Sequence, residues 1–495
     1  MQRLTGLDAT FLYLETPNNH MHVAGAAIFD PSTVPEGYSF DAVKDLVESR
    51  LHLLPPFRRR LVTVPFDLHH PLWIEDPDFD IEYHVRRAAL PSPGGLEELA
   101  EFTADVISRP LDRTKALWEM YLIEGLEGGF VAAVTKTHHA AIDGVSGAEL
   151  TVNLLDLTPE PAAVPPPEEQ WRPDRIPTDF ELVGYAVNSL ARQPLRALKT
   201  IRRTAEVALT LRRRNRQPDV KPPPGLFSAP RTPFNVSLTP HRKAAFKSVA
   251  LEDFKRVKNA FGTTVNDVVL AVCAGALRRY LLSRGELPDD PLVAMVPISV
   301  RSEDQAGTLG NRVSSMLVSL ATDIDDPVER LLTINGGTRE AKEQHNAIGA
   351  ETLSDWAEFA APAVAARAAR LASRMRVAER MKPIFNVTIS NVPGPPFPLY
   401  SAGARMVANY PLGPVNDGVG LNMTVMSYME SMDFGLTACS EVMPDLWDLA
   451  HAIGEALDEL VKAAADTEAP EPAVPPAPDA KPATRKTPAK AGGTV

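Results

Sequence analysis

Prolines are gathered in three places along this chain, and these clusters limit how it can fold. The sequence holds 46 prolines in 495 residues, about twice the usual share of near 5%. The clusters span 159–177, 218–240 and 470–488. Because proline fixes φ and lacks a backbone donor, such stretches do not fit central strands or helix interiors and are typical of linkers or tails.

The proline clusters predict a chain with two folded bodies, residues 1–158 and 231–465. A connector at 159–230 joins them, and a tail at 466–495 follows. Both bodies are long enough for a buried core, since domains usually hold about 100–200 residues. The tail is rich in Ala, Pro, Lys and Thr and has almost nothing to bury, so we predict that it is disordered.

Both bodies alternate patterns typical of helices with patterns typical of strands. Short apolar runs predict strands at 118–123, 130–137, 291–298, 312–320, 385–390, 421–429 and 434–438. The first two are separated by a Gly-rich turn, which indicates a hairpin. Helices are predicted after Gly95, Thr264, Asp326 and Asp445, where caps or prolines precede apolar periodicity. The fold class is therefore α/β, with two sandwich-like halves.

The charge balance argues against a nucleic-acid binder. Lys and Arg total 51 against 63 acids, a net charge of −12, whereas phosphate contacts need clustered cations. One stretch departs from this balance: residues 192–216 hold nine cations and one acid, with apolar residues among them. This segment is either a basic amphipathic helix on an anionic membrane or a solvated helix that covers the two bodies. A second basic segment, 367–382, allows the same two interpretations.

The cysteines and apolar runs set the expected compartment. Cys273 and Cys439 lie far apart without CxxC spacing, which indicates neither a disulfide framework nor a zinc site. The longest apolar run, 268–277, is about half of the roughly 20 residues that a spanning helix needs. The first residues contain an acid where a secretory signal would be apolar. We expect a cytoplasmic protein that contacts membranes only peripherally.

The sequence His-His-Ala-Ala-Ile-Asp-Gly at 138–144 carries the most chemical information. It follows a predicted strand and precedes a helical pattern, a place where catalytic side chains are often displayed. A neutral imidazole can take a proton from an attacking hydroxyl. Since neighbouring strand residues point to opposite faces, we expect only one histidine of the pair to face a cavity, while the other packs or orients.

Several alternatives for this motif stay open. The pair could be core histidines, or zinc ligands, although no further His, Cys or Glu follows at ligand spacing. No GxSxG elbow or catalytic cysteine motif accompanies the pair. Its absence favours direct transfer between two bound substrates over a covalent acyl-enzyme.

The chain resembles the bacterial wax ester synthase/acyl-CoA:diacylglycerol acyltransferase family from residue 1 to about 465. The resemblance rests on an ordered set of motifs. They are Leu-Asp-Ala-Thr-Phe at 7–11, Pro-Leu-Trp at 71–73, the His motif, Val-Asn-Asp-Val at 265–268, Pro-Ile-Ser-Val-Arg at 297–301, Ser-Asn-Val-Pro-Gly-Pro at 390–395 and Asp-Gly-Val-Gly-Leu-Asn at 417–422.

The resemblance implies a fold and an activity. The fold would be two chloramphenicol-acetyltransferase-like domains with the active site in a tunnel at their interface. The expected reaction moves a long-chain acyl group from acyl-CoA to diacylglycerol, or to a fatty alcohol. CoA is then part of a substrate, and no cofactor or metal is expected. Contact with a membrane or lipid droplet is expected through 192–216.

The resemblance also implies roles for single residues. His139 matches the general base and His138 its neighbour. Asp143 matches an architectural aspartate, and we propose Arg301 as its partner because a buried carboxylate requires a cation. Asn266 matches an asparagine that could donate to the developing oxyanion; the alternative is a helix-cap residue beside Thr264.

The remaining motif residues are expected to shape loops. Gly144 and Gly394 are backbone positions for tight turns or close approach. Pro393 would stiffen a turn after a strand, and Asn391 and Asp417 belong to the matching loops. Two other functions remain possible: an acyltransferase that draws on a carrier protein, and a catalytically silent lipid-binding scaffold on the same fold.

Overall fold

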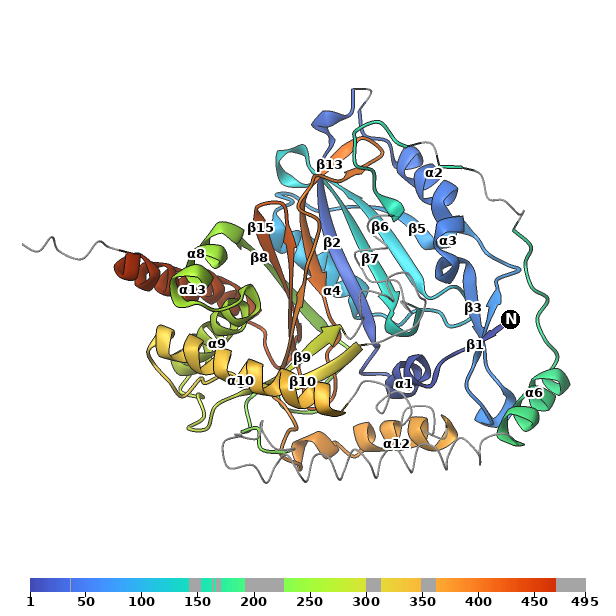
Figure 1. Cartoon of the computed structure of the whole chain (residues 1–495). Helices are drawn as coiled ribbons and strands as arrows, with labels where there is room; N and C mark the ends of the chain where they lie inside the picture. The colour runs from blue at the N-terminus through green and yellow to red at the C-terminus, as the bar shows by residue number, and fades with distance from the viewer. Residues whose placement is uncertain are drawn as a thin grey trace, which may run out of the picture.

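Two six-stranded sheets form the centre of the molecule (Figure 1). The computed structural model describes residues 1–35, 37–141, 153–162, 164–165, 171–191, 227–299, 313–348 and 362–468. In order across the first sheet lie β12 (Tyr400–Ser401), β13 (Ala404–Leu412), β2 (His22–Asp30), β7 (Val131–His138), β6 (Trp118–Glu124) and β5 (Val85–Ala89). The second sheet has β10 (Val313–Ser319), β9 (Val293–Ser299), β11 (Val387–Val392), β14 (Leu421–Tyr428), β15 (Ser431–Cys439) and β8 (Arg242–Ala250).

Helices cover the outer faces of the two sheets. The second sheet is covered by α8 (Leu251–Phe261), α9 (Val265–Ser283), α10 (Pro327–Ile348) and α13 (Leu446–Glu468), at the left of Figure 1. The rest of the molecule carries α1 (Gly6–Leu14), α2 (Phe40–Arg50), α3 (Ile81–His84), α4 (Leu96–Ile107), α6 (Asp179–Ala191) and α12 (Pro362–Arg374). A small third sheet joins β1 (Gln2–Arg3), β4 (Leu72–Glu75) and β3 (Arg59–Val62).

Local patterns account for many of these elements. The predicted hairpin is β6 and β7, which pair antiparallel. The predicted C-terminal runs correspond to β9, β10, β11, β14 and β15. Helix α9 begins where Thr264 accepts a hydrogen bond from the Asp267 amide, a capping box that satisfies amides without helical partners. Because residues 268–277 of α9 are apolar on all sides, this part of the helix belongs in a core, and it lies within the largest cluster of buried residues.

Strands β12 and β13 come from the second half of the chain but belong to the first sheet. Both fall in the predicted body 231–465, yet β13 pairs along β2, with Arg405 opposite Asp30 and Leu412 opposite Ala24. The two bodies are thus not independent along the chain, a difference from the predicted division at 159–230. The crossing covers the edge of β2, which would otherwise expose unpaired backbone groups. It also brings the sheets together: a Cβ at Gly435 would lie 2.0 Å from the Pro411 carbonyl oxygen.

The predicted connector and tail both contain folded residues. Within 159–230, α6 packs its Leu182 and Ala186 side chains against Val64 and Leu72. Helix α13 extends to Glu468, past the start of the predicted tail. Residues 192–216 and 469–495 lie outside the described residues. In the part of the chain that is described, no single helix is long and apolar enough to cross a membrane. Among these residues only α8 and α9 taken together reach the necessary length and apolar composition, and they are bent by 105° relative to each other.

Candidate functional site

The two motif histidines lie where β7 ends and a 3-10 turn, η6 (His139–Ala141), begins. The His138 amide donates to the Leu117 carbonyl at 3.0 Å, and the His139 amide donates to the Met21 carbonyl at 2.9 Å. Neighbouring strands therefore fix the backbone of both residues. His139 lines a large cavity, whereas His138 is buried away from it. The expectation that only one of the pair faces a cavity is confirmed.

The cavity has a volume of about 560 Å³ and lies between the two sheets. Its walls are mostly apolar with a few polar groups, the usual composition of a small-molecule site. From the first sheet it is lined by Ala133, Thr135 and Thr137 of β7, together with residues of β2, β6 and β13; from the second it is lined by Met295, Pro297, Thr388, Ser390, Val392, Asn422, Thr424 and Met426.

The His139 ring is held in an apolar setting. It stacks on Phe11 of α1, with ring centroids 3.9 Å apart and planes at 17°. Its Nδ1 is buried without a hydrogen-bond partner among the described residues. Burial lowers the pKa of His139 to about 4, because an apolar site disfavours the charged imidazolium. The ring is therefore neutral at pH 7 and able to accept a proton.

His138 stabilises the turn that carries His139. Its Nδ1 accepts a hydrogen bond from the Ala140 amide at 3.1 Å, which places the ring proton on Nε2. That Nε2 lies 3.3 Å from Glu15 Oε2, and Arg113 in turn donates to Glu15. Burial lowers the pKa of His138, and Glu15 opposes this shift. His138 thus has the contacts of an orienting residue, and sequence reasoning did not find Glu15.

A buried ion pair fixes β7 from its other face. Lys136 is 1% exposed, and its Nζ lies 3.0 Å from Glu119 Oε2 on β6. The same ammonium donates to the Val106 carbonyl at 3.0 Å and the Arg109 carbonyl at 3.2 Å. It therefore adds a donor to carbonyls at and just after the end of α4. A lysine in an apolar run was the signal that could have indicated this pair.

Neither Asn266 nor Asn391 belongs to the described lining of the cavity. Asn266 is half-buried in the first turn of α9, beside the capping residue Thr264, and among the described residues it does not belong to the cavity lining. Asn391 lies on β11 between Ser390 and Val392, whose side chains do line the cavity, so strand alternation turns it to the opposite face. The oxyanion role of Asn266 stays a prediction.

Of the remaining predicted residues, Pro393, Gly394 and Asp417 lie in loops, and the other three lie outside the described residues. A Cβ at Gly394 would lie 2.0 Å from the Ser427 carbonyl oxygen, so only glycine fits there, directly after the exposed Pro393. Asp417 Oδ1 accepts a hydrogen bond from the Leu238 amide at 2.9 Å and holds a loop. Asp143, Gly144 and Arg301 lie outside the described residues.

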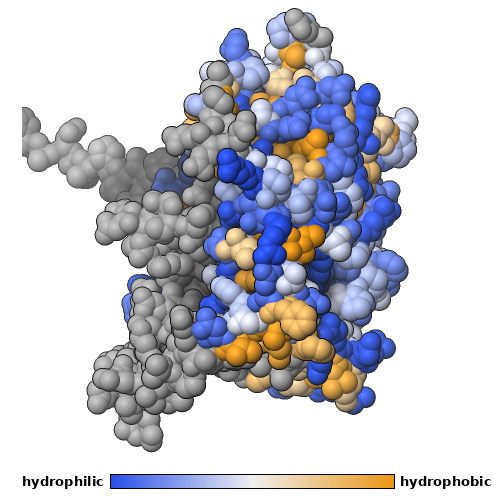
Figure 2. Space-filling model, turned by 90° about the vertical axis from the view of Figure 1, so that its right-hand side faces the viewer, coloured by the Kyte–Doolittle hydropathy of each residue, from blue (hydrophilic) through white to orange (hydrophobic). Residues whose placement is uncertain are grey.

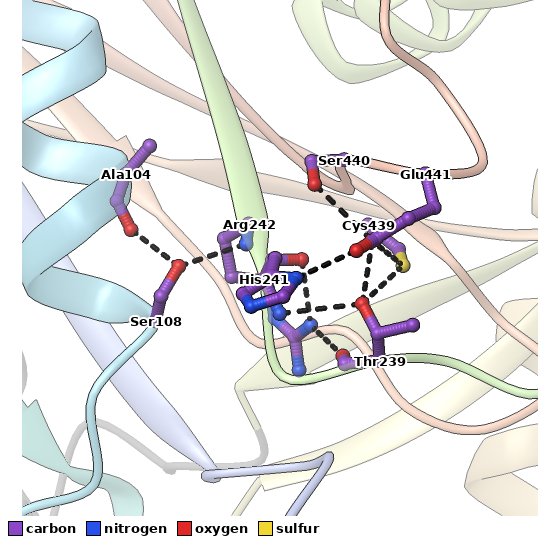
Figure 3. Close-up of polar contacts among 8 residues, drawn as sticks. All are labelled: Ala104, Ser108, Thr239, His241, Arg242, Cys439, Ser440 and Glu441. Carbon is purple, nitrogen blue, oxygen red and sulfur yellow. Dashed lines mark hydrogen bonds and ion pairs between the residues drawn. The ribbon is translucent and has the colours of Figure 1, made fainter.

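A polar junction joins the end of α4 to β8 and its neighbours (Figure 3). Ser108, just after α4, accepts from the Arg242 amide of β8 at 2.8 Å and donates to the Ala104 carbonyl at 2.7 Å. The Arg242 guanidinium donates to the Asn18 carbonyl and, at 2.5 Å, to the Thr239 carbonyl. The Ser108 and Asn18 contacts join β8 to the segments that follow α4 and α1, and they were not predicted from the sequence.

Two sheets that meet around a cavity, with a histidine at a strand end, make up a fold that condensation domains share. The first condensation domain of the CDA synthetase shares this fold, with a TM-score of 0.52 at 16% identity over 95% of this chain and 97% of that one. The chain belongs more narrowly to the wax ester synthase/diacylglycerol acyltransferase family. The catalytic-domain model of that family matches residues 4–269, and its C-terminal-domain model matches residues 309–461.

Individual relatives agree with this assignment. The wax ester synthase/diacylglycerol acyltransferase from Marinobacter aquaeolei VT8 superposes with a TM-score of 0.66 at 33% identity, over 94% of this chain and 100% of that one. "Probable diacyglycerol O-acyltransferase tgs2" of Mycobacterium tuberculosis is 38% identical over 467 residues, which cover 92% of this chain and 98% of that protein. Another M. tuberculosis protein, also named as a diacylglycerol O-acyltransferase, is 39% identical over 468 residues, which cover 94% of this chain and 91% of that protein.

Proposed function

We propose that this protein is an acyl-CoA:diacylglycerol O-acyltransferase that forms triacylglycerol, with fatty alcohols as possible further acceptors. The observation that carries the proposal is a neutral histidine, His139, at the wall of an apolar cavity of about 560 Å³ between two sheets. Relatives that match over most of this chain bear the name of that enzyme.

In the proposed mechanism His139 acts as the general base. Its imidazole takes the proton of the acceptor hydroxyl while that oxygen attacks the thioester carbonyl carbon. The tetrahedral oxyanion collapses, the carbon–sulfur bond breaks, and the imidazolium returns its proton to the CoA thiolate. Donors near the carbonyl would stabilise the oxyanion, and we assign Asn266 to this role as a proposal.

The cavity suits this chemistry because its walls are mostly apolar. A long acyl chain and a glyceride both bury hydrocarbon, and excluding water from the thioester prevents its hydrolysis. The low pKa of His139 keeps the base unprotonated before the acceptor binds. The transfer requires no metal or redox group, and CoA enters only as part of the donor substrate.

An acceptor panel tests the proposal directly. CoA release from one long-chain acyl-CoA should be fastest with diacylglycerol or a long-chain alcohol and slow with water alone. Offering the same acyl group on a carrier protein separates the condensation-type alternative, which would prefer that donor. Absence of CoA release with every acceptor would instead support the silent lipid-binding scaffold.

We also propose peripheral contact with an anionic membrane or lipid-droplet surface through residues 192–216. The support is compositional, since this stretch holds nine cations against one acid and anionic lipids attract such segments. Binding to anionic liposomes should fall with added salt and with neutralisation of Arg212, Arg213 and Arg214. Unchanged binding in that variant would leave the solvated-helix interpretation.

A further inference from the structure

We propose that three described elements form a lipid-docking face: α6, α12 and the 3-10 turn η4 (Pro65–Asp67). The face is separate from residues 192–216, and its occupant is an anionic lipid surface. Turn η4 contacts both helices, so the three elements are continuous. Helix α12 runs along the bottom of the molecule in Figure 1, and α6 lies at the lower right of the molecule in the same view. The inference rests on the proposed function only in that the acceptor is a lipid.

Helix α6 is apolar on two sides, and only one of them is packed. Leu182 and Ala186 face Val64 and Leu72. Residues 180, 183, 184 and 187 form a second apolar stripe at the i, i+3, i+4, i+7 spacing of one helix face. Within this stripe Phe180 is 92% exposed and Val187 is 58% exposed. An exposed aromatic of this kind on a helix with a packed opposite face points to a partner outside the chain.

Turn η4 presents a second aromatic beside this stripe. Phe66 is 85% exposed, and its backbone has a φ of 60°. A bulky residue rarely adopts this left-handed conformation. Leu68, next along the chain, is 39% exposed. Figure 2 shows hydrophobic side chains gathered at the lower end of the molecule, at the height of α6 in Figure 1.

Helix α12 supplies the cations of the face, whereas η4 and α6 contribute Asp67, Asp179 and Glu181, the last paired with Arg175. Its 13 residues include Arg367, Arg370 and Arg374 and no acid. All three arginines are exposed, and none forms an ion pair with a described residue. Leu371 and Met375 lie beside them and are 58% and 50% exposed. Apolar side chains flanked by unpaired cations are the composition of helices that lie in a membrane interface.

Two connections link this face to the site and to the basic stretch. Helix α12 packs against α1, whose Leu7 and Phe11 line the cavity. A lipid surface docked on α12 would therefore lie close to the wall that holds His139. Helix α6 ends at Ala191, and the chain continues directly into 192–216 with its nine cations. The cations that adjoin the face favour an anionic lipid surface as its occupant.

Vesicle flotation of the full chain tests the proposal. The patch variant combines Phe66→Asn, Phe180→Ser and Leu371→Gln, where asparagine tolerates the left-handed backbone at 66. The control combines Leu282→Gln and Leu332→Gln, which are 57% and 48% exposed on α9 and α10. On phosphatidylglycerol vesicles, partitioning of the patch variant should fall by roughly tenfold or more, while the control should match wild type. Both variants should keep the wild-type Tm.

A charge variant separates the contribution of the arginines from that of the apolar side chains. Replacing Arg367, Arg370 and Arg374 by glutamine should lower partitioning to phosphatidylglycerol vesicles by roughly tenfold and leave partitioning to phosphatidylcholine vesicles unchanged. Flotation of the patch variant at the wild-type level would overturn the proposal. The proposal would also fail if flotation were lost only in the variant with neutral residues at Arg212, Arg213 and Arg214. Flotation involves no catalysis, so failure of the proposed acyl transfer would be seen separately, in CoA release.

Discussion

The His139 ring lies flat on the Phe11 ring, with centroids 3.9 Å apart. The two residues are 128 positions apart in the chain, and Phe11 comes from the first helix. This contact, together with burial between the sheets, keeps the imidazole neutral and oriented.

Replacing His139 by glutamine should lower turnover by about 10²–10⁴-fold, the usual contribution of a positioned acid–base group. The measurement is CoA release at saturating acyl-CoA and diacylglycerol, with Tm to establish that the variant folds. His451→Gln, at an exposed position on α13, serves as the control and should leave turnover unchanged. Near-normal turnover in a folded His139→Gln variant would exclude this residue as the base.

The acid limb of kcat/KM should lie near pH 4. The reaction needs neutral His139, and burial lowers its pKa to about 4, so protonation begins to remove activity only well below the usual value of about 6.5. The rate should therefore be flat from pH 7.5 down to about pH 5 and fall tenfold per unit below about pH 4. A limb with an apparent pKa near 6.5 would contradict the buried, neutral state.

Phe11→Ala should move that acid limb upward. Removing the ring admits water beside His139 and weakens the desolvation that lowers its pKa, so the apparent pKa should shift from about 4 toward 6.5. Phe11→Leu keeps an apolar cover and should leave the limb nearly in place. The pH profile of kcat/KM for both variants makes the comparison, and identical profiles would show that Phe11 has no part in the shift.

Lys136→Met should destabilise the protein by about 1.5–3 kcal/mol, because Glu119 loses its 3.0 Å partner and keeps only Arg86 at 3.7 Å and the Tyr121 hydroxyl at 3.2 Å. The double variant Lys136→Met/Glu119→Gln should recover part of that loss. Denaturant unfolding of wild type, both single variants and the double variant gives the coupling. Strictly additive effects would show that the 3.0 Å contact contributes no interaction of its own.

Short-range patterns in the sequence determined much of the local structure. The turn between β6 and β7, the Thr264 cap of α9 and the end of β7 at the histidine pair each depend on residues within a few positions. Apolar alternation and capping act over one or two turns of chain, so they can be read without the fold. The same locality predicted that only one histidine of the pair would face a cavity, and the family resemblance assigned the role of base to His139.

Only the tertiary structure decided which distant segments meet. The pairing of β13 with β2 joins residues near 405 and 30, and no local pattern indicates which sheet edge a strand will cover. Glu15 and Phe11 reach the histidine pair only because α1 packs across the end of β7, and Lys136 finds Glu119 only once β6 and β7 pair. These contacts depend on burial and on sheet edges available after collapse, and such properties belong to the assembled chain and not to any stretch of its sequence.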